Sequence, residues 1–432
     1  MHHRPHPPFV APHAACSAST QRYNGCGIVR PLRILVVSSL FPHAAAPNAG
    51  LFIRERMFRV ARAGVPLRVL APQSWSPLDR VGRLFRGQFR ALGAPHEISD
   101  GVVIDRPRAL SIPMVLKSWD GPLMARSVQR TFDRIVEEFQ PTILDAHFLY
   151  PTGNATRALA RRHNLPYVVT VRGSADEWLI GTSCERRLVE TLRDAAHVIS
   201  VSAALKRNVV EHLVGDATPC TVIGNGVDLE KFRPLDRERA RAELRIDRAA
   251  SVLIGVGGLV ERKGFHRIIP LLPKLQRQFP KLVMLIVGGG TTMQDMRPQL
   301  EDLAAKAGAT DMVRFCGPQP PDKLALYYSA ADVFALATAH EGWANVFLEA
   351  MACGLPVVTT RVGGNAEVVC DDRLGSLVDF FDAERFTDAL GAALARAWDR
   401  QAIRDYARAN TWDMRIEQLL SLFGSLPSTP QR

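Results

Sequence analysis

Short, almost wholly apolar runs alternate along this chain with longer segments of helical periodicity, and glycine-containing loops separate the two. The first run, residues 32–37, is rich in β-branched residues, which is typical of a strand buried on both faces of a sheet. A loop ending at Gly50, a helical segment over 51–63 and a second apolar run over 65–70 follow it. This order predicts a strand–helix–strand unit, and therefore a parallel sheet covered by helices.

The alternation continues in two series. The expected strands are 142–145, 166–171, 198–201 and 221–223 in the first series, and 252–256, 282–287, 313–315, 333–336, 357–359 and 376–378 in the second, with helices at 155–162, 265–278 and 295–307. We therefore predict an α/β protein with two Rossmann-like parallel-sheet domains, 32–229 and 250–400, that face a central cleft. A polar segment over 230–249 is expected to connect the domains. We expect a disordered leader at 1–31 and C-terminal helices over 401–425 that pack back on the first domain.

The composition excludes several classes of protein. Of 432 residues, 47% are hydrophobic and 22% charged, which excludes a disordered chain. The net charge of +11 is weak evidence for nucleic acid, and no basic helix with interleaved aromatic residues accompanies it. The seven cysteines form no C-x-x-C pair and no run reaches 18 apolar residues, so we expect reduced thiols in a cytoplasmic protein without a transmembrane helix.

Two glycine segments follow strands of the second series, and neither fits a common nucleotide motif. In 255–264 the third glycine of G-x-G-x-x-G, which starts at Gly255, is missing because Val260 stands there, and the run 288–290 lacks it at Met293. The chain also has no P-loop sequence G-x-x-x-x-G-K-[ST]. These observations argue against a nicotinamide-dependent dehydrogenase and against a P-loop NTPase.

The first glycine segment nevertheless carries a candidate phosphate site. Gly257 and Gly258 form a turn that is followed by Arg262 and Lys263 beside an expected helix N-terminus. A guanidinium, an ammonium and free backbone N–H groups together can bind a diphosphate. The alternative is a solvated basic pair at the start of a helix.

Residues 340–356 contain two carboxylates around an expected helix start. Asn345 is suited to cap a helix over 346–353, so Glu341 lies on the loop before the helix and Glu349 one turn inside it. This spacing separates the carboxylates by on the order of 10 Å or more. Retaining glycosidases need about 5 Å and inverting ones roughly 6.5–9.5 Å, so different roles are expected for the two residues. Two exposed positions on a surface helix are the alternative.

The segment E-G-W-A-N-V-F-L-E-A-M-A-C-G-L-P-V-V, from Glu341 through Glu349 to Val358, resembles the E-x7-E signature of retaining glycosyltransferases of family 4, the glycosyl transferases group 1 type. Three further motifs in the same order resemble that family: V-G-G-L-V-E-R-K-G, V-I-G-N-G-V-D and V-G-G-N-A-E. The similarity covers about residues 32–425. The resemblance implies the GT-B fold.

The resemblance also implies a role for each matching residue. Glu349 would bind the ribose hydroxyls of a donor nucleotide, and Glu341 would contact hydroxyls of the transferred sugar. Arg262 and Lys263 would neutralise the diphosphate, so no metal and no cofactor are expected, in accord with the absence of a D-x-D triplet. The further donor-site residues that it implies are Gly342, Asn345, Val346, Gly257, Gly258, Gly50, Arg172 and Asn225.

One family feature is replaced in this chain. Where the family has T-x-H-G-x-D, this sequence reads T-V-R-G-S-A-D from Thr170 to Asp176, with Arg172 in place of the histidine. An arginine cannot accept a proton at neutral pH. His147 follows the preceding strand and is expected at the same cleft edge, either as a substitute base or as a structural histidine. A same-face reaction, in which the departing phosphate accepts the proton of the acceptor, would need no protein base.

We therefore predict a retaining, metal-independent glycosyltransferase that moves a sugar from a nucleoside-diphosphate sugar to a glycan or lipid-linked acceptor in cell-surface or exopolysaccharide synthesis. One alternative is a sugar-nucleotide epimerase with two similar domains, against which the E-x7-E motif argues. Another is a basic nucleic-acid-binding protein, and we expect no nucleic-acid partner. The residues leave the donor base (uridine or guanosine), the sugar and the acceptor open.

Segment 80–92 has the pattern of an interfacial membrane helix. Its Val, Leu and Phe residues recur at helical spacing, and four arginines supply positive charge without an acidic residue. We predict that it contacts an anionic membrane surface, which would place the protein at the inner face of the membrane. The alternative is a helix packed on the first domain.

Overall fold

The computed structural model describes residues 31–77, 79, 92–111, 117–291, 294–380 and 382–426. Two of the predictions fall outside these ranges. The expected interfacial helix at 80–92 lies outside the described residues except for Leu92, and the expected leader 1–31 does so except for Pro31. None of the helices within the described part of the chain has the length and hydrophobicity that crossing a bilayer requires.

The first half of the chain forms a sheet whose described strands run in the order β10-β9-β8-β7-β1-β2-β5-β4. These strands are β1 (Ile34–Val37), β2 (Leu67–Leu70), β4 (His96–Ser99), β5 (Val102–Asp105), β7 (Ile143–His147), β8 (Tyr167–Val171), β9 (His197–Ser200) and β10 (Cys220–Val222). All neighbours pair in parallel except the edge strand β4, which is antiparallel to β5. A separate parallel pair is formed by β3 (Gln73–Trp75) and β6 (Arg108–Leu110).

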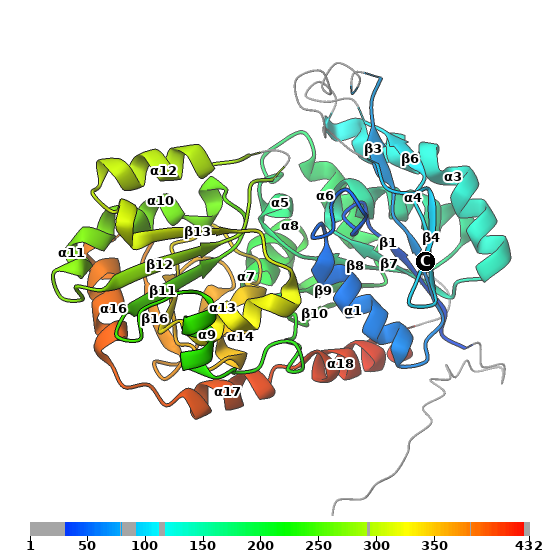
Figure 1. The fold of residues 1–432 in the computed structure, drawn as a ribbon. Coiled ribbons are helices and arrows are strands. Elements are labelled where there is room, and N and C mark those ends of the chain that lie inside the picture. The colour runs from blue at the N-terminus through cyan, green and yellow to red at the C-terminus, as the bar shows by residue number, and fades with distance from the viewer. Residues whose placement is uncertain are drawn as a thin grey trace, which may run out of the picture.

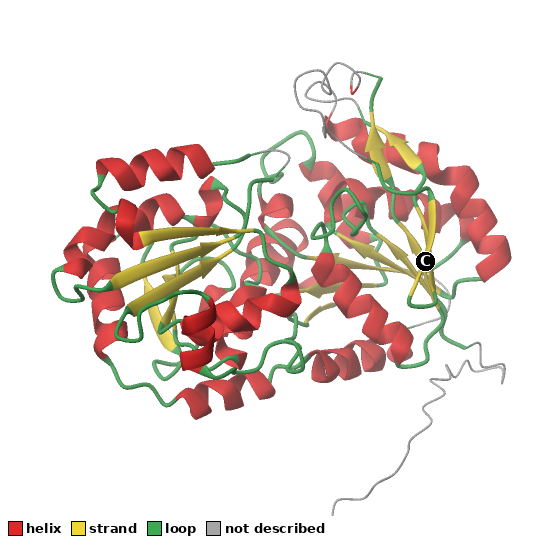
Figure 2. Ribbon diagram, in the orientation of Figure 1, coloured by secondary structure: helices red, strands yellow, loops and turns green. Residues whose placement is uncertain are grey.

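Helices cover both faces of this sheet (Figure 2). They are α1 (Leu51–Arg62), α3 (Asp120–Phe139), α4 (Asn154–His163), α5 (Ser174–Glu177), α6 (Glu185–Arg193), α7 (Ala203–Leu205) and α8 (His212–Val214). Side chains alternate along the buried strands, so Leu35 packs into one core with Phe132 while Ile34 packs into the other with Met57. The apolar β-branched run therefore forms a doubly covered strand, as predicted.

The second half of the chain forms a parallel sheet with the strand order β13-β12-β11-β14-β15-β16. Its strands are β11 (Ser251–Val256), β12 (Leu282–Val287), β13 (Val313–Gly317), β14 (Val333–Leu336), β15 (Val357–Thr360) and β16 (Gly375–Val378). Its helices are α10 (Phe265–Ile268), α11 (Leu272–Gln276), α12 (Arg297–Lys306), α13 (Leu324–Ala330), α14 (Asn345–Ala352), α15 (Asn365–Val368), α16 (Ala383–Ala395) and α17 (Arg400–Arg408). The prediction of two parallel-sheet units is confirmed (Figure 1).

One predicted helix is divided. The expected helix over 265–278 is interrupted by the 3-10 turn Ile269–Leu271 between α10 and α11. Pro270 and Pro273 lie at the starts of the second and third pieces, where the missing N–H of proline is tolerated. The prolines therefore break a continuous helical ladder that the apolar periodicity alone would predict.

The polar segment 230–249 is part of the second domain rather than a free connection. It contains α9 (Arg237–Glu243), whose buried Arg241 donates hydrogen bonds to the Ala330 carbonyl at 3.0 Å and to Asp332 at 2.8 Å. Phe232, just before it, belongs to the second core. The polarity of this segment predicts a free connection, and that prediction is wrong. The buried Arg241 has three acceptors, the third being the Arg248 carbonyl, and these bonds anchor a helix whose sequence is polar.

The C-terminal helices divide between the two domains. In α17, Ile403 belongs to the core of the second domain. The last helix, α18 (Trp412–Ser425), returns to the first domain, where Ile416, Leu419 and Phe423 join the same core as Met57 of α1. Figure 1 shows α18 in red, running below the blue α1.

Candidate functional site

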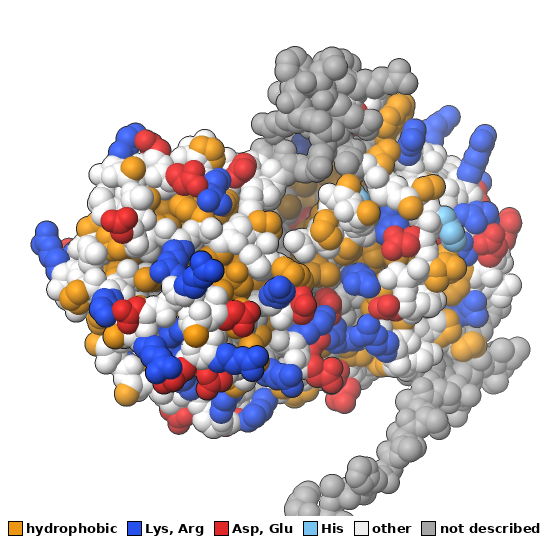
Figure 3. All heavy atoms as spheres, in the orientation of Figure 1, with side chains coloured by type: hydrophobic (Ala, Val, Ile, Leu, Met, Phe, Trp, Pro, Cys, Tyr) orange, Lys and Arg blue, Asp and Glu red, His pale blue; other side chains and the backbone are white. Residues whose placement is uncertain are grey.

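A cavity of about 520 Å³ lies between the two domains. Its first-domain wall is the start of α1, including Phe52 and Glu55, and its second-domain wall includes the ends of β11 and β12. Figure 3 shows the surface hollowed where the two halves of the molecule meet. The cavity thus occupies the place where parallel-sheet domains bind ligands, beyond the carboxyl ends of the strands.

Backbone atoms of glycines form much of the second-domain wall. Gly257, Gly258 and the run 288–290 all line the cavity. Gly288 has φ +146°, and a Cβ there would lie only 1.9 Å from the Gly257 carbonyl oxygen. Any other residue at 288 would force these two loops apart, so the sequence leaves peptide groups rather than side chains facing the ligand space.

Helix α14 presents its first turn to the cavity through Asn345, Val346 and Glu349. The expectation that Asn345 caps this helix is wrong: Ala344 occupies the N-cap position, and Asn345 is the first helical residue. The Asn345 side-chain oxygen instead accepts a hydrogen bond from Asn225 of the loop after β10, at 2.9 Å. This bond joins the two domains beside the cavity.

Glu349 is a half-buried carboxylate with one hydrogen-bond donor among the described side chains. The hydroxyl of Tyr328 in α13 donates to Glu349 Oε2 at 3.0 Å. Burial raises the pKa of Glu349 to about 7, although the Tyr328 hydrogen bond and the charge of Lys263 both act to lower it. A half-buried carboxylate that faces an open cavity is suited to accept hydrogen bonds from ligand hydroxyls.

Glu341 is paired with both predicted cations. Its Oε1 accepts from Lys263 Nζ at 2.6 Å, from Arg262 at 2.9 Å and from the Thr338 hydroxyl at 3.2 Å. Burial acts to raise the pKa of Glu341, but the charges of Lys263 and Arg262 outweigh it and hold that pKa below its usual range. The structure thus brings these three predicted residues together, although none of them lines the cavity directly.

Lys263 lies at the edge of the cavity. Its methylene carbons would be 3.3 Å from a Cβ placed on Gly257, and the 3-10 turn Glu261–Lys263 carries it there. Gly264 ends that turn at φ +77°. The ammonium is therefore held between the glycine wall and the Glu341 carboxylate.

His147 and Arg172 are buried in the first domain and do not line the cavity, although the Arg172 guanidinium lies over the ring of the cavity-lining Phe52, 5.3 Å from its centroid. His147 is fully buried; its Nδ1 accepts from Arg172 Nε at 3.0 Å, and its Nε2 lies 3.5 Å from Asp145. Burial and the charge of Arg172 hold the pKa of His147 well below its usual value. Of the two alternatives for His147, the structure therefore favours the structural histidine over the substitute base, because the ring is fully buried. Arg172 continues the network to the Asn225 side chain at 3.2 Å.

Two further glycines have their close contacts with protein rather than with the cavity. At Gly50, φ is +69° and a Cβ would lie 2.2 Å from the Leu40 carbonyl oxygen, so the close approach that requires glycine is within its own loop. Gly50 does not itself line the cavity, although its neighbours Asn48 and Leu51 do, so its place in the donor site stays a prediction. At Gly342 a Cβ would lie 2.4 Å from the Arg172 carbonyl oxygen, so the loop after Glu341 touches the end of β8.

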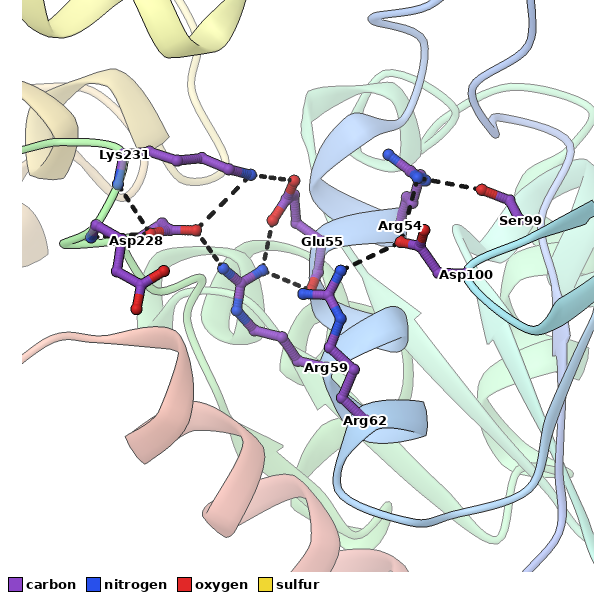
Figure 4. Close-up of polar contacts among 9 residues, drawn as sticks. Arg54, Glu55, Arg59, Arg62, Ser99, Asp100, Asp228 and Lys231 are labelled. Carbon is purple, nitrogen blue, oxygen red and sulfur yellow. Dashed lines mark hydrogen bonds and ion pairs between the residues drawn. The ribbon is translucent and has the colours of Figure 1, made fainter.

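Sequence reasoning missed an ion-pair cluster on the cavity wall. Lys231 Nζ lies 2.8 Å from Glu55, and Arg59 pairs with both Glu55 and Asp228 (Figure 4). Glu55, Asp228 and Lys231 line the cavity. Glu55 and Arg59 are four residues apart on α1, but their partners Lys231 and Asp228 are more than 160 residues away, so no local pattern could have revealed the pairing between the two segments.

A second missed contact crosses the cleft. The exposed ring of Trp178, after α5, meets the ring of His340 edge to face, with centroids 5.7 Å apart. Glu367 of α15 accepts hydrogen bonds from the backbone N–H groups of Ala203 and Ala204 at 2.7 and 2.8 Å. The two domains are thus in contact around the cavity.

Two Rossmann-like domains that enclose a cavity lined by a glycine wall and an E-x7-E helix define a GT-B protein. Solved structures agree with this fold: sucrose-phosphate synthase from Thermosynechococcus elongatus superposes with a TM-score of 0.74 at 22% identity, covering 90% of this chain and 98% of that one. HepE from Anabaena, solved in complex with UDP-glucose, gives a TM-score of 0.69 at 19% identity over 91% of this chain and 100% of that one.

Sequence comparisons identify the family. Residues 236–410 match the glycosyl transferases group 1, and residues 49–231 match Glycosyltransferase Family 4. A D-inositol 3-phosphate glycosyltransferase from Segniliparus rotundus is 32% identical over 423 residues, which is 90% of this chain and 88% of that protein. The chain belongs to the family 4 glycosyltransferases of the group 1 type.

Similarity to other relatives is more local. A D-inositol 3-phosphate glycosyltransferase from Corynebacterium urealyticum is 37% identical over 259 residues, which is 57% of this chain and 60% of that protein. The match to a protein of the same description from Mycobacteroides abscessus is 32% identical and likewise spans 60% of its length.

Proposed function

We propose that the protein transfers a sugar, with retention of configuration, from a uridine-diphosphate sugar bound in the interdomain cavity to a hydroxyl of an acceptor. The observation that carries this proposal is that Glu349 and the glycine wall line the same cavity, with Lys263 beside Gly257 at its edge. The UDP and UDP-glucose complexes of HepE support uridine as the base. The names of the relatives support a phosphorylated cyclitol as acceptor, beside the glycan or lipid-linked acceptor expected from the sequence.

The ribose and the diphosphate of the donor would contact different parts of the cavity wall, a carboxylate and a glycine backbone. The ribose hydroxyls would donate to the Glu349 carboxylate, and the diphosphate would lie along the backbone of Gly257 and Gly258. Lys263 and Arg262, now paired with Glu341, would turn toward the phosphate oxygens while Glu341 accepts hydrogen bonds from the sugar. Exchange of one anionic partner for another keeps these cations neutralised in both states.

The transfer step depends on stabilising the leaving group. The bond between the sugar C1 and the diphosphate oxygen breaks while the acceptor oxygen bonds to C1 on the same face, and the departing phosphate takes the acceptor proton. Negative charge grows on the diphosphate as this bond breaks, so Lys263 and Arg262 stabilise the transition state more than the ground state. Because these residues supply positive charge, we propose that no divalent metal is required.

Two assays test the proposal. A thermal-shift screen with UDP, GDP, ADP and their sugars should show that a uridine nucleotide raises the melting temperature. In the transfer assay, EDTA should leave the rate of product formation unchanged. Mass spectrometry of reactions with UDP-glucose or UDP-N-acetylglucosamine, and with inositol 3-phosphate, oligosaccharides or lipid-linked sugars, should show a glycosylated acceptor and free UDP. An altered sugar nucleotide formed without any acceptor would instead indicate an epimerase.

A further inference from the structure

Buried Tyr328 and half-buried Glu349 form a polar pair at the wall of the cavity. Tyr328 is fully buried, yet its hydroxyl reaches Glu349 Oε2 at 3.0 Å. Glu349 lines the cavity, so its carboxylate stands between the tyrosine on one side and the ligand space on the other. The tyrosine therefore contacts the carboxylate from behind, where a donor nucleotide would not compete for it.

Aromatic packing holds the Tyr328 ring in place. Phe232 meets it edge to face and Phe334 lies on another side, each with a ring-centroid distance of 6.2 Å. Phe334 comes from the central strand β14, and Phe232 from the segment just before α9, which packs into the same core. A ring enclosed in this way keeps its hydroxyl at one position, so the hydrogen bond orients the carboxylate rather than following it.

The charges that face Glu349 come from several elements. The ionised carboxylate is favoured by Lys263, in the turn after β11, and by Lys231, just before α9. Glu55 of α1 opposes it. Cys353, one turn further along α14, has its thiol pKa raised by burial and by Glu349. The Tyr328 hydrogen bond acts in the same direction as the two lysines.

We propose that Tyr328 is a positioning residue for nucleotide binding, whose hydroxyl keeps the Glu349 carboxylate ionised and turned toward the ribose of the donor. This inference rests on the proposed function, because it requires a ribose in the cavity. The pKa of Tyr328 is raised well above its ordinary value by burial and by Glu349, so the hydroxyl remains a donor at every pH at which the protein would be assayed.

The proposal makes nucleotide affinity depend on pH in a defined direction. Only the ionised carboxylate can accept two ribose hydroxyls, and its pKa is about 7 in the empty site. Affinity for UDP should therefore rise as the pH increases through about 7, and binding near that pH should release protons from Glu349. Loss of the Tyr328 hydroxyl removes a donor to the ionised form and moves this transition to higher pH.

The test compares Tyr328→Phe with the wild-type chain by titration calorimetry with UDP at about pH 6.5, 7.5 and 9. Tyr328→Phe retains the ring and its packing, and a shift of one pKa unit weakens binding about tenfold where the carboxylate is mostly protonated. We expect about a tenfold higher Kd at the lowest pH and a difference within about twofold at the highest. The ionisation of UDP itself cancels in the ratio of the two Kd values.

The chain offers a matched control in the adjacent residue. Tyr327 is partly exposed, and its hydroxyl is influenced by Cys316 and Glu243 rather than by Glu349. Tyr327→Phe should bind UDP as the wild-type chain does at each pH. A purely structural role for Tyr328 would raise Kd by the same factor at all three pH values, which would overturn the proposal.

A second variant keeps the test valid if Tyr328→Phe folds poorly. Glu349→Gln cannot ionise, so it should release fewer protons than the wild-type chain when UDP binds near pH 7, as measured from binding heats in two buffers of different ionisation enthalpy. The difference between the two proteins excludes the protons that UDP itself exchanges. Equal proton release by the wild-type chain and by Glu349→Gln would overturn the inference while leaving the proposed function intact. Binding of neither UDP nor GDP by the wild-type chain would refute both.

Discussion

At the residue scale, Glu349 combines burial with access to the cavity, and its removal should affect ligand binding more than folding. Glu349→Ala should raise the Kd for UDP by roughly ten- to a hundredfold, since hydrogen bonds to a charged acceptor contribute about 1.5–3 kcal/mol. Calorimetry with UDP measures this, and Glu384→Ala, an exposed position at the start of α16, is the control. Unchanged affinity would remove Glu349 from the donor site.

Lys263 should have its effect on the rate rather than on ground-state binding. Lys263→Ala should lower kcat by on the order of a hundredfold or more and change KM for the donor much less, because the charge that it stabilises grows in the transition state. Lys274→Ala is a suitable control, since the Lys274 side chain is 55% exposed and its ammonium makes only a long contact of 4.0 Å with Asp388. A near-normal kcat in Lys263→Ala would transfer the leaving-group role to Arg262.

At the element scale, the turn that carries Arg262 and Lys263 depends on Gly264. A Cβ at this residue would lie 1.8 Å from the Ala337 carbonyl oxygen, and φ is +77°. Gly264→Ala should therefore lower the free energy of unfolding by about 1–3 kcal/mol or more and reduce kcat as well, because the turn has to move. Thermal and urea unfolding measure the first effect.

Gly308 provides the matched control for that substitution. Its φ is +69°, yet nothing lies within 4 Å of a Cβ there. Gly308→Ala should thus show only the cost of the left-handed backbone, about 1 kcal/mol, and full activity. Equal losses of stability and activity in the two variants would contradict the role given to the contact with Ala337.

The elements differ in how far the sequence predicts them. Buried parallel strands such as β12 were predicted to the residue, because a doubly covered strand requires a continuous apolar run. The edge strand β4 was missed, since His96–Ser99 is mostly exposed and carries no such run. In the candidate site the motif residues could be placed on loops and helix starts. The hydrogen-bond partners of Glu341 and Glu349 could not be predicted from local sequence. Lys263 and Tyr328 are 78 and 21 residues away from them and come into contact only in the folded chain.

At the scale of the whole molecule, ion pairs join α1 of the first domain to Asp228 and Lys231, where the chain passes into the second domain. Arg59, with its side chain only 15% exposed, pairs with Asp228, whereas Arg62 on the same helix is 63% exposed and pairs with Asp100 (Figure 4). Arg59→Ala should lower the free energy of unfolding by about 1–3 kcal/mol, because it leaves two half-buried carboxylates with Lys231 alone.

The Arg62→Ala variant is the control for this prediction. An exposed pair contributes only about 0–1 kcal/mol. Urea unfolding at low salt and at about 1 M NaCl distinguishes the two variants, since screening weakens the exposed pair more than the half-buried one. Equal losses for Arg59→Ala and Arg62→Ala would show that the Arg59 cluster contributes no more to stability than the exposed pair does.

The return of α18 to the first domain has a consequence for how this chain can be divided. The polypeptide crosses between the domains twice, and the crossings are bonded to each other: Val227 N–H donates to the Asn410 carbonyl at 3.0 Å, and Trp412 N–H to the Val227 carbonyl at 3.2 Å. A fragment cut once near residue 230 would lack Ile416, Leu419 and Phe423, and would expose the apolar face of α1 that they cover. The first domain is therefore discontinuous in sequence, and expressing it alone requires a segment from each side of the second domain, joined by a new loop.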